Sequence, residues 1–342
     1  MRTKGVYRNA DNTFQQHDGD PYIYLRIMRE WYCYNPNEKP LGGGAMGDVY
    51  LGYRIKTRTP IAVKRVKDAY ANNRQIRDRA RQEASLAFRH QNLVEMIGCC
   101  EYDAHSCTGP IWILSNLVQG ENIDKYIQNN LTYDPARVEK ICTAIKSILD
   151  ALEYIHSKGV IHRDIKPSNI MIEKGFNARL MDLGISRMNG GNKFSSYGFI
   201  GTPEYSAPEQ IKRQEGNTGE PINATTDIYE LGITFYELLD GKNPMLDSSE
   251  SETLARQINE DLPPSPSIPN KLMKVIWKAT EKEQAKRYQT AREFRDAIDE
   301  ALLPEKPWWE TVSEWMQTNI VGIVASIVAI GVIIFIIVLM TR

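Results

Sequence analysis

The sequence has 342 residues, of which 42% are hydrophobic and 25% charged, which is typical of a folded chain with two or three domains. Its 42 Lys and Arg residues against 43 Asp and Glu residues give a net charge of −1, so the overall balance does not indicate a nucleic-acid partner. Five scattered cysteines exclude a disulfide scaffold and fit a reducing compartment. The Cys-Cys pair at 99–100 lies near His105 and Cys107, but without a Cys-x-x-Cys pair a strand followed by a loop explains them better than a zinc site.

Residues 1–36 lack the charged and then apolar pattern of a signal peptide. Within them, residues 22–28 and 31–34 are rich in aromatic and β-prone side chains. We therefore interpret residues 1–36 as an N-terminal extension that packs on the lobe that follows it.

A glycine-rich stretch, Leu-Gly-Gly-Gly-Ala-Met-Gly-Asp-Val-Tyr, follows at residues 41–50. It carries three spaced glycines and then a valine: Gly42, Gly44, Gly47 and Val49. This spacing fits a hairpin whose backbone can approach phosphate groups, because no Cβ stands in the way. By themselves the glycines also fit a dinucleotide-binding turn, a flexible linker or an ordinary hairpin. The next apolar run ends in the lone Lys64, and this order of strand, glycine hairpin, strand and lysine is not that of a dinucleotide fold.

Helices and one more buried strand are predicted farther along the chain. Residues 69–88 form a predicted helix in which Glu83 is the single glutamate. We interpret the Lys- and Arg-rich segment 64–89 mainly as a solvated helix face, with a docking surface as the alternative. Residues 111–114 form a buried strand that leads into a connection at 115–120. Residues 135–157 carry apolar side chains at helical spacing, with Pro135 in the first turn.

The short polar segment 162–169, His-Arg-Asp-Ile-Lys-Pro-Ser-Asn, lies between two β-prone runs. Asp164, Lys166 and Asn169 can face one small volume, where they offer a carboxylate for a hydroxyl proton, a cation for phosphate oxygens and an amide oxygen for a metal. Asp182 follows Asn169 by thirteen residues and begins an Asp-Leu-Gly turn. A solitary Asp-x-Gly is usually only a turn, but here three polar residues stand at a matching distance. Phosphoryl transfer requires mainly such positioning and charge neutralisation.

Together these motifs resemble those of the protein kinases, from residue 41 to about 302. The resemblance implies an α+β, two-lobed protein-kinase fold, with a small β-rich N-lobe at about 37–115 and a large α-helical C-lobe at about 116–302. It also implies ATP and Mg²⁺ as cofactors. The chain departs from the family in having Leu for Phe in the Asp-Phe-Gly motif and a short spacing between Glu83 and His90.

The resemblance further implies a role for each matched residue. Asp164 would orient and deprotonate the acceptor hydroxyl, and Lys166 would stabilise the transferring γ-phosphoryl group. Lys64, fixed by an ion pair with Glu83, would position the α- and β-phosphates. The residues implied to contact the nucleotide are Leu41, Gly42, Gly44, Gly47, Val49, Ala62, Lys64, Asn169 and Asp182, and those implied to hold Mg²⁺ are Asn169 and Asp182.

Other positions extend the resemblance and bear on specificity and regulation. Lys166 and the segment 201–205, Gly-Thr-Pro-Glu-Tyr, resemble the serine/threonine kinases, and Arg287 matches the arginine that pairs with Glu209. Asp227 matches the helix that anchors the catalytic loop. Arg163 could pair with a phosphorylated residue of the loop after Asp182, which predicts activation by phosphorylation on Ser195 or Ser196. Ordinary loop polarity is the alternative explanation of these two serines.

Residues 320–340 form an unbroken apolar run of 21 residues, which at about 1.5 Å per residue spans roughly one bilayer core. A buried core helix is the alternative, but it would be unusually long and apolar on all sides. We therefore expect a single transmembrane helix after a linker at 303–319. The kinase domain would lie in the cytoplasm, where ATP is available, and the helix would lie in the plasma membrane if the protein is bacterial. Two overlapping pairs of small residues, Gly322 with Ser326 and Ala325 with Ala329, suggest a homodimer through this helix.

The sequence therefore predicts a membrane-anchored serine/threonine protein kinase that autophosphorylates its activation loop and acts on Ser and Thr hydroxyls of proteins. One alternative is a pseudokinase, an ATP-binding membrane scaffold, which is disfavoured because no reactive residue is missing. The other is a small-molecule kinase, disfavoured by residues 201–209, which resemble the peptide-docking segment of protein kinases.

Overall fold

The computed structural model describes most of the chain up to residue 304 and parts of the C-terminal segment. The residues it describes are 7–8, 14–15, 19–44, 47–71, 73–85, 88–103, 108–182, 202–214, 216, 220–304, 309, 313, 315–316, 319–320, 330–331, 333–334, 336–338 and 340. The chain divides into two compact units, Met1–Ala301 and Leu302–Arg342, and each is described by itself.

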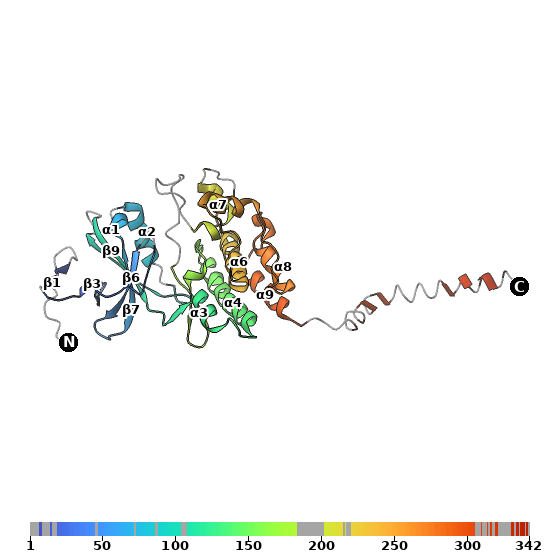
Figure 1. The fold of residues 1–342 in the computed structure, drawn as a ribbon, viewed down its shortest axis with the longest axis horizontal. Coiled ribbons are helices and arrows are strands. Elements are labelled where there is room, and N and C mark those ends of the chain that lie inside the picture. The colour runs from blue at the N-terminus through green and yellow to red at the C-terminus, as the bar shows by residue number, and fades with distance from the viewer. Residues whose placement is uncertain are drawn as a thin grey trace. The chain divides into compact units, whose positions relative to one another are not determined.

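The first unit contains a seven-stranded antiparallel sheet preceded by the two-residue strands β1 (Tyr7–Arg8) and β2 (Phe14–Gln15). The strands of the sheet are β3 (Ile23–Ile27), β4 (Glu30–Tyr34), β5 (Gly42–Gly43), β6 (Gly47–Arg54), β7 (Pro60–Val66), β8 (Met96–Asp103) and β9 (Thr108–Asn116). Their order is β3-β4-β6-β7-β9-β8, and β5 pairs with β6. Figure 1 shows α1 and α2 beside this sheet, with the larger helices of the unit gathered beyond it. The prediction of a strand-rich N-lobe and a helical C-lobe is confirmed.

The N-terminal hairpin β3–β4 belongs to the N-lobe sheet, because β4 also pairs with β6. Leu25 on β3 and Tyr34 on β4 are fully buried in one apolar cluster with side chains of β7, β8 and β9. The Trp112 indole N–H donates a hydrogen bond to the Tyr34 hydroxyl at 2.8 Å. The prediction that this aromatic segment packs on the lobe is therefore confirmed, and the segment supplies part of the lobe's core.

The single helix predicted at 69–88 is wrong, because the structure has two helices there, α1 (Asp68–Ala71) and α2 (Arg74–Ser85). The Asn73 amide closes a turn on the Tyr70 carbonyl at 3.0 Å, and the Asn73 carbonyl accepts the Arg77 amide at 3.0 Å. Asparagine is unfavourable inside a helix and favourable just before one, because its side chain competes for backbone hydrogen bonds.

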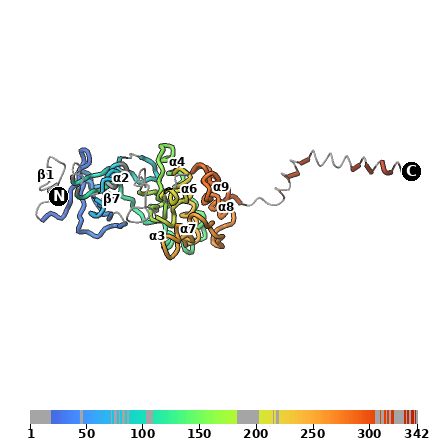
Figure 2. Tube along the Cα trace, turned by 90° about the horizontal axis from the view of Figure 1, so that it is seen from above, coloured from blue at the N-terminus to red at the C-terminus, as the bar shows by residue number. Residues whose placement is uncertain are grey.

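The C-lobe is built from helices around one large apolar core. Its helices are α3 (Ile123–Asn130), α4 (Arg137–His156), α5 (Pro208–Gln214), α6 (Ala224–Asp240), α7 (Glu250–Asn259), α8 (Asn270–Ala279) and α9 (Ala291–Leu302). The predicted 135–157 helix is confirmed as α4, but the placement of Pro135 in its first turn is wrong, because Pro135 precedes the N-cap residue Ala136. Figure 2 shows α4 and α6 within this group of helices, away from β7 and α2.

A three-stranded antiparallel sheet lies beside these helices and carries the polar segments of interest. Its strands are β10 (Gly120–Asn122), β11 (Ile170–Glu173) and β12 (Asn177–Leu180), in that order. Ile170 pairs with Leu180, so the start of β11 and the end of β12 lie at one edge. Residues 162–169 enter at this edge and residues 181–182 leave it.

Among the described residues of the chain, no helix is both long enough and apolar enough to cross a membrane. Most of the segment predicted to span one, including residues 321–329, lies outside the described residues. The predicted transmembrane helix therefore stays a prediction. The described cysteines Cys33, Cys100 and Cys142 are free thiols. His105 and Cys107, which belong to the group considered for a zinc site, lie outside the described residues.

Candidate active site

The loop at 162–169 is held by the buried helix α6. The Asp227 carboxylate accepts hydrogen bonds from the backbone amides of His162 at 2.8 Å and Arg163 at 2.7 Å. One turn farther along α6, Glu230 accepts the Ile165 amide at 2.8 Å. The predicted anchoring role of Asp227 is confirmed. These bonds hold Arg163 at φ +66°, a left-handed backbone that costs a non-glycine residue about 1–3 kcal/mol.

His162 connects this loop to the segment that carries Asp182. A backbone amide can only donate and a carbonyl can only accept, so Nδ1 accepts from the Asp164 amide at 3.3 Å and Nε2 donates to the Met181 carbonyl at 3.0 Å. Burial lowers the pKa of His162 below its ordinary value, against the opposing charge of Asp227. The neutral imidazole therefore connects the two loops through hydrogen bonds and does not act as a proton carrier.

Three predicted or neighbouring polar side chains meet in one hydrogen-bonded chain. Lys166 Nζ donates to Thr202 Oγ1 at 2.7 Å, and Thr202 Oγ1 donates to Asp164 Oδ1 at 2.9 Å. Lys166 Nζ also lies 3.3 Å from Asp164 Oδ2. A carboxylate is thus already accepting a hydroxyl hydrogen beside a cation. The sequence placed Thr202 only in a docking motif, and its contact with Asp164 was not predicted.

Asn169 and Asp182 flank the edge where β11 begins and β12 ends. The Met181 amide donates to the Asn169 carbonyl at 2.8 Å, which ties the two segments together. Asn169 Nδ2 donates to the Asp164 backbone carbonyl at 2.7 Å and to Asp164 Oδ2 at 3.2 Å, so Oδ1 is the atom of this amide that could ligate a metal. The Asp182 carboxylate is about half exposed. Amide and carboxylate oxygens at one edge fit Mg²⁺ held together with phosphate oxygens.

Lys64 reaches across from β7 to this edge. Its Nζ lies 3.0 Å from Asp182 Oδ2, which brings a predicted phosphate-binding residue next to a predicted magnesium ligand. The backbone of Glu83 lies in α2, but its side chain lies outside the described residues. The predicted ion pair between Lys64 and Glu83 therefore stays a prediction.

The predicted glycine hairpin is confirmed by the pairing of β5 with β6. The Leu41 amide donates to the Val49 carbonyl at 2.8 Å. A Cβ added to Gly42 or Gly44 would meet no atom within 4 Å, which leaves room for a bound group. At Gly47, by contrast, a Cβ would lie 2.5 Å from the Arg65 carbonyl oxygen, so this glycine is required by close packing on β7.

Two further residues predicted to contact the nucleotide, and one residue that the sequence did not single out, lie near the glycine hairpin. Ala62 pairs with Ser115 at the end of β9, where the chain leaves the N-lobe, and Val49 pairs with Lys64. Lys67 Nζ donates to the Gly44 carbonyl at 2.8 Å. Lys67 was not singled out in the sequence, because a lysine in a Lys-rich segment carries no distinguishing signal.

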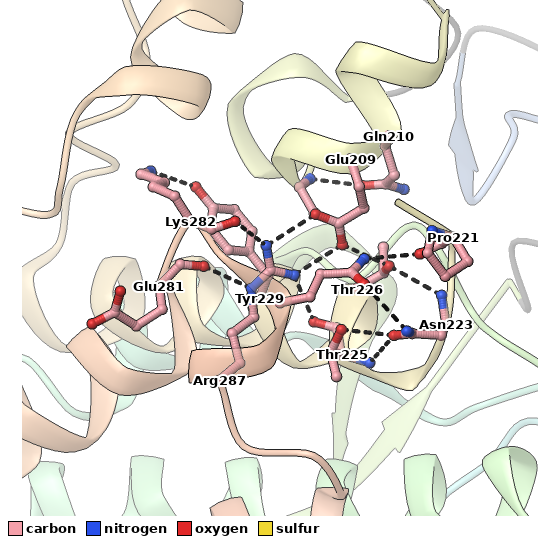
Figure 3. Close-up of polar contacts among 12 residues, drawn as sticks. Glu209, Gln210, Pro221, Asn223, Thr225, Thr226, Tyr229, Glu281, Lys282 and Arg287 are labelled. Atoms are coloured by element: carbon pink, nitrogen blue, oxygen red, sulfur yellow. Dashed lines mark hydrogen bonds and ion pairs between the residues drawn. The ribbon is translucent and has the colours of Figure 1, made fainter. Parts of the chain in front are cut away.

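The predicted pairing of Arg287 with Glu209 is confirmed and is shown in Figure 3. Both side chains are fully buried, and the guanidinium donates to the two carboxylate oxygens at 2.8 and 2.9 Å. Burial raises the pKa of Glu209, but the hydrogen bonds and charge of Arg287 outweigh it, so the pKa ends below its ordinary value. Thr226 on α6 also donates to Glu209 at 2.8 Å. This network joins α5 to the helix that anchors the 162–169 loop.

The segment before α5 is fixed to the C-lobe in the same way. The Tyr205 hydroxyl donates to Glu237 on α6 at 2.6 Å, and Asn243 Nδ2 donates to the Glu204 carbonyl at 2.9 Å. Residues 202–205 are therefore tied to the C-lobe beside Asp164. The loop at 183–201, with Ser195 and Ser196, lies outside the described residues.

Comparison with known proteins extends over the same region. The protein kinase domain family matches residues 36–300. Serine/threonine-protein kinase PknB of Mycolicibacterium smegmatis is 32% identical over 280 residues, which cover 78% of this chain and 43% of that protein. PrkC of Bacillus subtilis is 30% identical over 277 residues, which cover 78% of this chain and 41% of that protein. Serine/threonine-protein kinase pkn2 of Myxococcus xanthus is 30% identical over 275 residues, which cover 76% of this chain and 31% of that protein. The chain thus spans less than half the length of these curated relatives.

Proposed function

Because the chain belongs to the protein kinase family, we propose that it transfers the γ-phosphoryl group of ATP to serine and threonine hydroxyls of proteins. The observation that carries the proposal is the contact of Asp164 with a hydroxyl group beside Lys166. The relatives named above are bacterial serine/threonine-protein kinases, and the chain shares about 30% identity with them.

Each residue of the site has a task in this reaction. The substrate hydroxyl oxygen forms a bond to the γ-phosphorus while the bond from that phosphorus to the bridging oxygen breaks, and the hydroxyl proton leaves toward Asp164. The Asp164 carboxylate accepts and orients this hydroxyl, as it now accepts that of Thr202 at 2.9 Å. Lys166 lies close enough to stabilise charge on the transferring group.

The nucleotide would be held between the lobes. Lys64 would bind the α- and β-phosphates, and the open backbone at Gly42 and Gly44 would cover them. Asn169 and Asp182 would hold Mg²⁺, which supplies neutralisation of phosphate charge when bound.

The test is transfer of labelled phosphate from ATP to a generic basic protein by the full chain in detergent, with and without Mg²⁺, followed by phosphoamino-acid analysis. We expect phosphoserine or phosphothreonine, and a fall of about 10²- to 10⁴-fold in kcat for Asp164→Asn, because the base is lost. Transfer to sugars or aminoglycosides instead would favour the small-molecule alternative. Absence of any transfer by wild type that still binds ATP would favour the pseudokinase scaffold.

We also propose that phosphorylation of Ser195 or Ser196 activates the enzyme. Arg163 stands directly before Asp164 and is held by α6, so a phosphate bound to it would order the loop against the reacting residues. A chain with Ser195→Ala and Ser196→Ala should lose autophosphorylation at these sites and have lower kcat. Unchanged activity in both this variant and the double Glu variant would disprove the hypothesis.

A membrane anchor at residues 320–340 completes the proposal, with the kinase domain in the cytoplasm. The support is the apolar run of 21 residues and its length. The small residues Gly322 and Ser326, with Ala325 and Ala329, would allow two such helices to pack closely and promote phosphorylation between copies. Bulky replacements there should lower both association and autophosphorylation.

A further inference from the structure

Arg77 is a fully buried cation at the start of helix α2. Its Nε donates to the Ala71 carbonyl at the end of α1 at 2.6 Å. Its Nη1 donates to Glu101 on β8, and its Nη2 donates to the Gly109 carbonyl on β9. One guanidinium therefore joins α1, β8 and β9 to α2, which lies beside these strands in Figure 1.

Glu101 is shared by a second arginine one turn farther along α2. Arg81 Nε donates to Glu101 Oε1, and its Nη2 donates to Oε2 at 3.0 Å. Only 9% of the Glu101 side chain is exposed. Because Arg77 and Arg81 are four residues apart, both lie on one face of the helix. Their common partner fixes the rotation of α2 about its axis and its height along β8.

The described contacts of α2 with the sheet combine this polar anchor with a small apolar one. Of the α2 side chains that the structure describes, Arg77 and Ala80 are the buried ones. Ala80 packs in an apolar cluster with Val66, Ile111 and Ile113, and Arg77 adds polar bonds to α1, β8 and β9. Buried ion pairs are weak evidence for stability but can fix one packing arrangement among several.

We propose that Arg77 is a positioning residue, which through Glu101 holds α2 at the place where Glu83 can fix Lys64 for the nucleotide phosphates. Glu83 lies six residues after Arg77 on the same short helix, so a shift of α2 at one end moves the other. The inference rests on the proposed kinase function for its effect on activity, but the attachment of α2 can be measured without it.

The test compares Arg77→Lys and Arg77→Met with Arg81→Met in the full chain. Lysine keeps the charge but lacks the planar fork that spans three partners. Each variant is assayed well below its own unfolding temperature, for kcat, KM for ATP, KM for protein substrate, and hydrogen exchange at residues 73–85. We expect both Arg77 variants to have a higher KM for ATP and a lower kcat. Together these changes should lower kcat/KM for ATP by about 10- to 100-fold. Both variants should leave KM for protein within about twofold and exchange faster in α2.

Arg81→Met should have a smaller effect in the same direction, because Arg77 still holds Glu101. Unchanged kcat/KM for ATP and unchanged exchange in folded Arg77→Lys would overturn the proposal, even if its unfolding temperature falls. Should Arg77→Met not fold, Arg77→Lys and Glu101→Gln decide by the same readouts. If wild type transfers no phosphate, the proposed function fails, and nucleotide affinity together with hydrogen exchange still judges the attachment of α2.

Discussion

At the residue scale, Thr202 joins the two charged groups that the sequence assigned to catalysis. Its hydroxyl accepts from Lys166 and donates to Asp164, so it bridges the two groups beside their direct ion pair. Thr202→Val removes both bonds and keeps the shape of the side chain, and hydrogen bonds to charged groups are worth about 1.5–3 kcal/mol each. We expect kcat to fall at least about tenfold, as measured by steady-state transfer to protein. Thr202→Ser, which keeps the hydroxyl, should retain most of the activity, and equal losses in the two variants would contradict this role.

Two buried groups make stability depend on acid. The pKa of His162 is lowered by burial, so the folded state resists a proton that the unfolded chain binds below about 6.5. The contribution of His162 to the free energy of unfolding is therefore fully present above about pH 6.5. It is lost as the pH falls toward the lower pKa of the folded state. Glu209 acts in the same direction below about 4.5, because Arg287 favours its charged form.

Urea unfolding from pH 8 to pH 4 should therefore give a midpoint that is steady at first and declines below about pH 6.5. His162→Gln is the control, because its amide does not titrate. That variant should lose the first part of the decline and keep the part that begins near pH 4.5. An identical profile in both proteins would show that another group causes the decline.

The residues of the site were predictable where chemistry and spacing coincide. Asp164, Lys166 and Asn169 stand in one short segment, so their meeting follows from sequence alone. Thr202 and Arg77 were not predictable as contacts, because each acts on a residue far along the chain. A threonine in a loop and an arginine in a Lys- and Arg-rich helix look like surface residues until the fold brings their partners close.

At the element scale, the N-terminal hairpin β3–β4 is part of the N-lobe core. Leu25 is fully buried, whereas Met28 at the turn of the same hairpin is 91% exposed. Leu25→Ala should lower the free energy of unfolding by about 2–5 kcal/mol, since it leaves a cavity among packed side chains. Met28→Ala should change it by less than about 0.5 kcal/mol. Urea denaturation measures the free energy of unfolding of both variants. A small effect of Leu25→Ala would mean that the hairpin contributes little to the core of the lobe.

The elements were predicted where the apolar pattern is clear, as in α4 with its helical periodicity and in the strand at 111–114, which is apolar throughout. The division of α1 from α2 was missed, because both pieces are polar and Asn73 breaks the helix without a glycine or proline to mark it. The strand β3 was expected only as packed aromatic sequence. Its side chains pack with residues of β8 and β9, which lie far along the chain and which no local pattern reveals.

At the scale of the whole molecule, the chain divides at Leu302 into the kinase unit and a C-terminal segment. The kinase unit contains every described residue of the candidate site. We therefore expect residues 1–303 to fold and to transfer phosphate in solution, with kcat within about threefold of the full chain when substrate is saturating and both proteins are phosphorylated to the same extent. This expectation is checked by steady-state assay of both proteins, and loss of activity on truncation would give the C-terminal segment a direct part in the reaction.

The proposed anchor makes a sharper prediction about location. Ile330 and Ile334 lie in the apolar run. Replacing both by Arg places two charges near the middle of the span, and inserting each charge costs about 2.5–3.5 kcal/mol on insertion scales. The full chain should float with lipid vesicles after insertion, the double Arg variant should stay in the soluble fraction, and the matched double Leu variant should behave as wild type. Phosphate transfer to a soluble protein should be similar in all three, because the reacting residues lie in the other unit. Flotation of the double Arg variant equal to that of wild type would show that residues 320–340 do not span the bilayer, and attachment would then have to come from another part of the chain.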